Sequence, residues 1–144
     1  MRPRILVTRK ISDLAEKKLQ EEFDVELNPK DVPIKDKDLS KIANNFDGMI
    51  STGWDNLGKS FFENLSDKIK IISQVGAGYD NIYIQSAQKK NIKITNTPNV
   101  LNESVAEVTI LLILAASRRA NEGLKLVKSN NWKSLPPDVI KTMI

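Results

Sequence analysis

The sequence predicts an α/β fold built on a parallel β-sheet, and two observations support this prediction. Short apolar segments of strand length alternate with amphipathic stretches of helical periodicity from the first residues onward, a pattern typical of a parallel sheet with helices on its faces. The chain has 144 residues, which suits one domain with a sizeable core and is too few for two complete domains.

Five strands are expected, and five strands fit a flavodoxin-like sheet with helices on both faces. Ser12 or Asp13 is the expected N-cap of the first helix. The buried face of that helix should comprise Leu14, Ala15 and Leu19. The expected strands are residues 4–8, 24–27, 48–51, 70–74 and 93–95, and the helices between them are residues 12–22, 35–44, 59–65 and 83–90.

The segment most informative about chemistry is the glycine pair that follows the fourth strand. Gly76 and Gly78 permit a sharp turn and leave backbone N–H groups uncovered by side chains, and such donors can hold an anion. The spacing lacks the third glycine of a dinucleotide fingerprint, because Asn81 stands in its place. The pattern alone leaves three hypotheses open: a tight strand-to-helix turn, a dinucleotide site, or a backbone anion site.

Right-handed crossovers would bring three loops to one edge of the sheet, where open α/β sheets bind their ligands. These loops are residues 8–11, 51–57 and 75–81. Gly53 and Trp54 should therefore be neighbours of Gly76. Trp54 either lines a ligand pocket or is an ordinary packed surface aromatic, and the sequence leaves both alternatives open. The two residues after it, Asp55 and Asn56, are expected to shape the turn rather than to react.

A long helix is expected after the sheet, which ends at a proline. Ser104 and Glu107 have capping-box spacing, and the helix should run to about Glu122 or Val127. Its centre, residues 108–116, is apolar almost all the way round, but arginines stop this run short of the about 20 residues that a membrane span needs. We therefore predict residues 1–98 as one domain, and residues 99–144 as a helix and tail whose apolar surface needs a further domain or a second copy of the chain.

Composition excludes several classes of site. The chain contains no cysteine and no histidine, so a disulfide, a zinc site with thiolate or imidazole ligands, and imidazole catalysis are excluded, and no metal site is expected. The net charge is +4, but the lysines are interleaved with acids, as in KDVPIKDKDLSK, so no nucleic-acid partner is expected. The first ten residues, MRPRILVTRK, lack the apolar core of a secretory signal, which favours a cytoplasmic protein.

Three segments in this order resemble the N-terminal part of the D-2-hydroxyacid dehydrogenase family: VGAGYDNI at 75–82, NIKITNTPNVLNESVAEVTILLILAASRR at 91–119, and Trp132. The resemblance covers nearly the whole chain. The family includes glyoxylate/hydroxypyruvate reductases, phosphoglycerate dehydrogenase, formate and phosphite dehydrogenases and a corepressor branch. It implies a flavodoxin-like substrate domain, a dinucleotide-binding domain inserted near its end, and an active site in the cleft between them.

The resemblance assigns binding residues to this chain and no catalytic residue. It implies that backbone amides of one loop bind the substrate carboxylate, that a second loop also contacts the substrate, and that the start of the long helix touches the nicotinamide side of the cofactor. Glu107 is assigned a structural role. The substrate-side residues are Val75, Gly76, Ala77, Gly53 and Trp54, and the cofactor-side residues are Leu101 and Val105.

The family's glycine-rich cofactor loop, catalytic arginine, glutamate and general-acid histidine match positions beyond Ile144. Hydride transfer needs a dinucleotide beside the substrate and a proton donor. We therefore expect the substrate-binding part of an NAD(P)-dependent oxidoreductase for a small 2-oxo acid and its D-2-hydroxy acid. This chain alone should be inactive and should bind neither NAD nor NADP tightly.

The alternative is a non-enzymatic carboxylate-binding or assembly module of the same fold. A receiver or flavin protein is disfavoured, because a receiver needs acids where Arg9 and Lys10 follow the first strand. The expected partners are the small 2-oxo or 2-hydroxy acid and, for the long helix, either the dinucleotide-binding domain or a second copy of the chain through the helix at 103–122.

Overall fold

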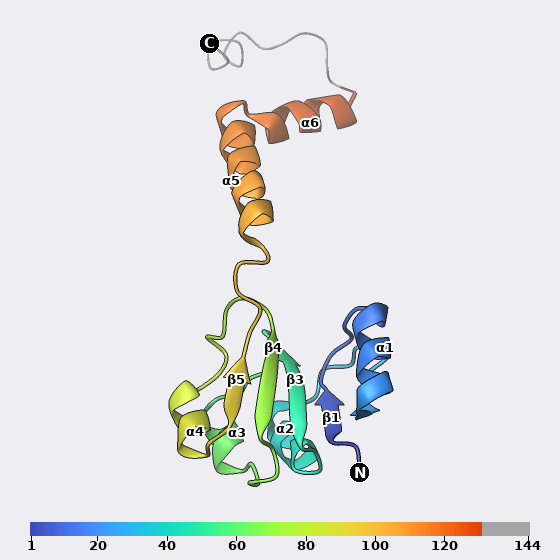
Figure 1. Ribbon diagram of the computed structural model, residues 1–144. Coiled ribbons are helices and arrows are strands. Elements are labelled where there is room, and N and C mark those ends of the chain that lie inside the picture. Colours follow the sequence, from blue (N-terminus) through green and yellow to red (C-terminus); the bar gives the residue numbers. More distant parts are fainter. Residues whose placement is uncertain (131–144) are drawn as a thin grey trace. The chain divides into compact units, whose positions relative to one another are not determined.

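The chain divides into two units, Met1–Asn99 and Val100–Ile144, and a five-stranded parallel sheet forms the centre of the first. The structure is a computed structural model that describes residues 1–130. The strand order is β2-β1-β3-β4-β5, which is the flavodoxin-like order, so the predicted fold class is confirmed. Figure 1 shows β1, β3, β4 and β5 of this sheet in that order. The strands are β1 (Arg4–Val7), β2 (Asp24–Glu26), β3 (Gly48–Thr52), β4 (Ile71–Val75) and β5 (Lys93–Thr95).

Four helices connect these strands, and every strand and helix begins and ends within two residues of its predicted limits. Ser12 is the N-cap of the first helix, as predicted, because its side chain accepts a hydrogen bond from the backbone N–H of Ala15 at 3.3 Å. The helices are α1 (Asp13–Glu22), α2 (Asp36–Ala43), α3 (Lys59–Glu63) and α4 (Ile84–Lys89).

The hydrophobic core lies on the face of the sheet that α2, α3 and α4 cover. Leu6, Met49 and Ile72 project from three neighbouring strands into one buried cluster with residues of these helices. Side chains alternate between the two faces of a strand, so the residues next to these three in sequence face the other way. Ile50 and Ser73 do so, and together with α1 they line a groove of about 370 Å³ on the opposite face. Helices therefore cover both faces, but α1 covers the second face only in part.

The predicted buried face of α1 is wrong in one residue. Leu14 is 68% exposed, whereas Ala15 and Leu19 are half-buried and line the groove. Ala15 and Leu19 are four residues apart and share one side of the helix, and Leu14 is turned away from that side. The buried residue of α1 is Glu16, whose carboxylate lies 2.5 Å from Nζ of Lys10.

The second unit contains two helices in its described part, α5 (Asn102–Ser117) and α6 (Ala120–Lys128), where one helix was predicted. Arg119 separates them with a left-handed backbone, φ 49°. The N–H of Arg119 bonds to the carbonyl of Ala116, three residues back, at 3.1 Å, and this tighter turn ends α5. The predicted capping box is also wrong, because Leu101 is the N-cap of α5 and Ser104 lies inside the helix.

The middle of α5 is apolar on every side, and none of its residues is buried within the part of the chain that the structure describes. Ile113, for example, is 62% exposed. Over residues 1–130, no helix has both the length and the apolar character needed to cross a membrane. The surface of α5 therefore has the composition of a protein interior.

Candidate functional site

The loops after β1, β3 and β4 lie at one edge of the sheet, as predicted. The parallel register pairs Thr52 with Val75 at the last position of β3 and β4, so the loops that follow start side by side. At the end of β1, the N–H of Thr8 donates to the carbonyl of Ile50 at 3.0 Å. The three loops thus meet at the carboxyl ends of neighbouring strands, where α/β sheets of this type bind ligands.

Gly53 and Gly76 are neighbours, as expected. A Cβ atom built on either glycine would lie 4.0 Å from Nε2 of Gln74, so the two loops flank one side chain. Trp54, next to Gly53, is 85% exposed, which does not fit a packed surface aromatic. Its indole is therefore available to a ligand at this edge.

Only one of the two glycines after β4 has a backbone that other residues rarely adopt. Gly76 has a positive φ of 155°, whereas the φ of Gly78 is not in the positive range that other residues avoid. The N–H of Gly76 donates to Oγ1 of Thr97 at 3.2 Å, and the N–H of Thr97 donates back to the carbonyl of Gly76 at 3.0 Å. The amide of Gly76 is therefore occupied, in contrast to the open donor that its sequence predicts.

Other amides at this edge remain open. Among residues 1–130, no hydrogen bond uses the N–H of Gly53, Ala77 or Gly78. The carbonyl of Ala77 accepts a hydrogen bond from Nδ2 of Asn96 at 2.8 Å, which fixes the orientation of this peptide. Two adjoining loops thus present backbone donors of the kind that bind a carboxylate. That Val75, Gly76, Ala77, Gly53 and Trp54 bind a substrate stays a prediction.

Asp55 shapes the turn after β3, as expected, and is buried. Its Oδ2 accepts hydrogen bonds from the N–H of Thr52 at 2.8 Å and from Oγ1 of Thr8 at 2.6 Å. Asn56 ties the same turn to α2, because its Nδ2 donates to Oδ2 of Asp36 at 3.0 Å. These contacts are structural, and they hold Gly53 and Trp54 in place.

Several residues of this edge were missed in the sequence. Thr97 and Asn96 orient the loop after β4 from about 20 positions downstream, and no local pattern identifies them. Gln74 and Ser51 carry a signal, because each is a polar residue near the end of an otherwise apolar strand. Both are buried, and Oγ of Ser51 donates to Oε1 of Gln74 at 2.8 Å.

Arg9, which follows β1, forms an ion pair with Asp31. Nε and Nη2 of Arg9 donate to the two oxygens of Asp31 at 2.7 Å and 3.1 Å, and the N–H of Lys10 donates to the same carboxylate at 3.0 Å. These hydrogen bonds, that of Arg9 above all, lower the pKa of Asp31 to about 2. The Arg9–Asp31 pair joins the loop after β1 to the loop after β2.

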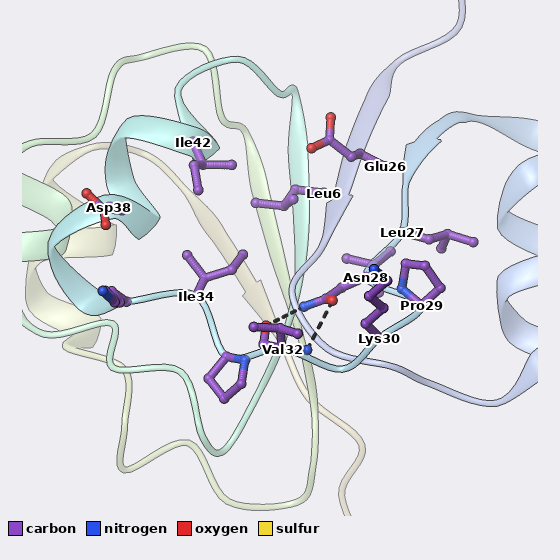
Figure 2. Close-up of a pocket in the computed structure, with 13 residues that line it drawn as sticks. Leu6, Glu26, Leu27, Asn28, Pro29, Lys30, Val32, Ile34, Asp38 and Ile42 are labelled. Atoms are coloured by element: carbon purple, nitrogen blue, oxygen red, sulfur yellow. Dashed lines mark hydrogen bonds between the residues drawn. The ribbon is translucent and has the colours of Figure 1, made fainter.

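A separate cavity of about 580 Å³ opens beside the loop after β2 (Figure 2). Its walls include Leu6, Val32 and Ile34, and Asn28 fixes the loop by donating from Nδ2 to the carbonyl of Val32 at 2.7 Å. The N–H of Val32 donates in return to Oδ1 of Asn28 at 3.2 Å. None of the predicted substrate residues lines this cavity.

The two predicted cofactor-side residues belong to the second unit. Leu101 is the N-cap residue of α5, and the N–H of Val105 donates to its carbonyl at 2.9 Å. Because they are four residues apart at the start of a helix, their side chains share one side of it. Both side chains are exposed in the described part of the chain.

Comparison with known families gives one match that spans most of the chain. Residues 5–135 match the model of the D-isomer specific 2-hydroxyacid dehydrogenase catalytic domain. A glyoxylate reductase from Pyrococcus horikoshii is 35% identical over 133 residues, which are 92% of this chain and 40% of that enzyme. The chain therefore spans about 40% of the length of the curated relatives that it matches.

Solved structures agree with this match. A Polaromonas sp. JS6 66 protein, assigned to the D-isomer specific 2-hydroxyacid dehydrogenases, superposes with a TM-score of 0.81 at 27% identity, over 95% of this chain and 43% of that one. An NADPH-dependent glyoxylate/hydroxypyruvate reductase from Sinorhizobium meliloti, solved with NADP and malonate, superposes with a TM-score of 0.72 at 27% identity. That alignment covers 92% of this chain and 40% of the reductase.

The positive φ of Gly76 predicts a difference between the two glycines of the loop. Gly76→Ala should lower the free energy of unfolding by about 1–3 kcal/mol, because alanine is strained at this φ. Gly78→Ala is the matched control and should change it by less than about 0.5 kcal/mol, since the new Cβ would meet Asp80 at an ordinary 3.5 Å. Denaturant unfolding monitored by circular dichroism measures both values, and equal losses would contradict the account of the turn.

The lowered pKa of Asp31 predicts a pH-dependent contribution to stability. Because the folded pKa of about 2 lies below the ordinary value of 3.8, the contribution is complete above about pH 4 and is lost as the pH falls toward 2. Asn is a suitable replacement for Asp31, because asparagine tolerates the left-handed backbone of this position. Asp31→Asn removes the ion pair with Arg9 and should lower the melting temperature at neutral pH. This difference between wild type and variant should shrink in acid.

The control for this experiment is Asp67→Asn. Asp67 is exposed and lies 3.8 Å from Nζ of Lys90, so its substitution should change the melting temperature little at any pH. A deficit of Asp31→Asn that is the same at pH 7 and at about pH 2 would exclude the ion pair as its cause.

Proposed function

Because the chain belongs to the D-isomer specific 2-hydroxyacid dehydrogenase family, we propose that it is the substrate-binding part of an NAD(P)-dependent oxidoreductase that interconverts a small 2-oxo acid and its D-2-hydroxy acid. The observation that carries the proposal is the set of open backbone donors at Gly53, Ala77 and Gly78. These amides come from two adjoining loops at the edge where ligands of such sheets bind. A carboxylate is the common feature of every acid in the proposed class.

In the proposal, some of the predicted substrate residues donate hydrogen bonds, and the others shape the loop or contact the acid. In the proposal, the N–H groups of Gly53 and Ala77 bind the carboxylate oxygens, and Gly76 supplies the backbone bend that presents the second loop. Val75 and Trp54, both exposed, contact the rest of the acid. In the proposal, the size of Trp54 favours a small substrate, because this large residue directly follows Gly53 in the chain.

The residues of this chain fit one side of a nicotinamide cofactor. Leu101 and Val105 form an apolar pair at the start of α5, which suits contact with the nicotinamide ring. The cofactor, NAD or NADP, supplies or accepts the hydride when it is bound. The loop at 76–81 does not fit the pyrophosphate, because the side chain of Asn81 occupies the place of the third glycine and bonds to the neighbouring loop.

Binding and turnover by the purified chain test this proposal. Glyoxylate should bind weakly, with a Kd on the order of 1 mM or above, because one wall of the site supplies only hydrogen bonds and little buried area. In a ¹⁵N-resolved titration the amide signals of Gly53, Ala77 and Gly78 should move, while that of Gly123 in α6 should not. No oxidation of NADH or NADPH should accompany binding.

Three results of this titration are decisive. Absence of shifts at these amides would refute the carboxylate site. Oxidation of NADH or NADPH by the purified chain would refute the expectation that this chain alone is inactive. Tight and selective binding of the acid would instead favour the alternative of a non-enzymatic carboxylate-binding module.

We also propose that α5 is covered in the working protein by a dinucleotide-binding domain or by a second copy of this chain. Burial of four of its large apolar side chains would contribute about 1.5–3 kcal/mol each, comparable to the stability of a whole domain. These include Ile110, Leu111 and Ile113. An isologous pairing is the commonest way for identical chains to bury such a surface.

Sedimentation velocity of the purified chain checks the pairing through α5. The wild type should sediment as a dimer at micromolar concentration, and Ile113→Lys should shift it toward the monomer, because a lysine ammonium is costly to bury. Lys41→Gln, an exposed change in α2, is the control and should leave the distribution unchanged. A folded monomeric wild type at every concentration measured would exclude the second copy as the cover of α5.

A further inference from the structure

One amide side chain, that of Asn81, joins the two loops that carry the open backbone donors. Its Nδ2 donates to the carbonyls of Thr52 at 3.2 Å and of Asp55 at 2.8 Å, so it holds both ends of the turn that contains Gly53. Its Oδ1 accepts a hydrogen bond from Nε2 of Gln74 at 3.0 Å. Both N–H hydrogens and the oxygen of the amide are therefore engaged, which fixes its orientation.

Gln74, the donor to Oδ1 of Asn81, is itself buried and hydrogen-bonded. Gln74 is 2% exposed, and its Oε1 is held by the buried hydroxyl of Ser51. Its Nε2 lies 4.0 Å from the Cβ positions of both Gly53 and Gly76. The chain of hydrogen bonds from Ser51 through Gln74 to Asn81 thus runs directly beneath the place where the two loops meet.

The backbone of Asn81 continues the same connection. Its carbonyl accepts a hydrogen bond from the N–H of Leu57 at 2.9 Å, and the carbonyl of Leu57 accepts one from the N–H of Tyr83 at 2.9 Å. On its other side, the turn is held by the buried carboxylate of Asp55. The turn at 52–55 is therefore held from the end of β1 and from the loop after β4. Among residues 1–130, Asn81 is the only residue of that loop whose side chain donates hydrogen bonds to the turn.

The chemistry of this position requires an amide. Two carbonyl oxygens face one end of the side chain and an N–H group faces the other, so the residue must donate twice and accept once. An aspartate would place a carboxylate oxygen against the two carbonyls, and an apolar residue would leave buried groups unpaired. The residue that interrupts the dinucleotide fingerprint therefore has a function of its own.

We propose that Asn81 is a positioning residue of the substrate site, which sets the separation between the N–H of Gly53 and the N–H groups of Ala77 and Gly78. The inference rests on the proposed function, because the separation matters only if one anion bridges both loops. A carboxylate accepts from both loops at once only if each donor lies about 2.7–3.2 Å from an oxygen. A shift of one loop by about 1 Å removes one set of donors.

The experiment compares glyoxylate binding to the full chain and to Asn81→Asp. The substitution keeps the size of the side chain and removes both N–H donors. Binding should weaken about tenfold or more, as expected when hydrogen bonds to a charged group lose their alignment. Asn64→Asp is the matched control. Asn64 is the C-cap residue of α3, and its Nδ2 donates to the carbonyl of Ser60 at 2.8 Å, so the loss of this bond should leave the Kd unchanged.

A second variant, Asn81→Ser, keeps one hydrogen-bond donor, and its Kd should lie between those of the wild type and Asn81→Asp. It also allows the inference to be tested if the aspartate variant does not fold. The Kd is measured by the ¹⁵N titration well below the melting temperature, so a loss of stability alone does not change it. Wild-type binding with an unchanged Kd in a folded Asn81 variant would overturn the inference and leave the proposed function intact. Absence of wild-type binding would overturn both.

Discussion

Polar side chains buried beneath the loops at the carboxyl edge of the sheet must be hydrogen-bonded, and this constraint fixes the shape of the candidate site. Within residues 1–130, no buried side-chain nitrogen or oxygen lacks a partner. Ser51, Gln74 and Asn81 form one continuous chain of hydrogen bonds, and Thr8 joins Asp55 beside it. These hydrogen bonds join the turn after β3 to the loop after β4, and the open amides of Gly53, Ala77 and Gly78 lie on these two loops.

The two units differ in how far their apolar side chains are buried. The first has its own core between the sheet and α2, α3 and α4, and it carries the two loops with open backbone amides. The second, in its described part, consists of helices with no buried residue. In the proposed function, α5 is covered by a dinucleotide-binding domain or by a second copy of the chain. The chain spans about 40% of the length of its curated relatives. In the proposed function, the pyrophosphate site and the proton donor are not among the residues described for this chain.

The sequence predicted the strands, the connecting helices and the neighbouring positions of Gly53 and Gly76, because each depends on local periodicity or on the handedness of crossovers. It did not predict the break at Arg119, where a residue other than glycine takes a left-handed backbone. Nor did it predict that Thr97 occupies the amide of Gly76, since this contact joins residues 21 positions apart. The role of Asn81 was hidden for the same reason, because its partners lie 26 and 29 positions earlier in the chain.

In the proposed function, backbone amides of two loops, and not side-chain cations, bind the carboxylate of a 2-oxo acid. A crystal structure of the chain with oxamate, a stable analogue of such an acid, tests this most directly. The account predicts carboxylate oxygens about 2.7–3.2 Å from the backbone nitrogens of Gly53 and of Ala77 or Gly78. Oxamate bound only elsewhere, for example at Lys30 beside the cavity of the loop after β2, would contradict it.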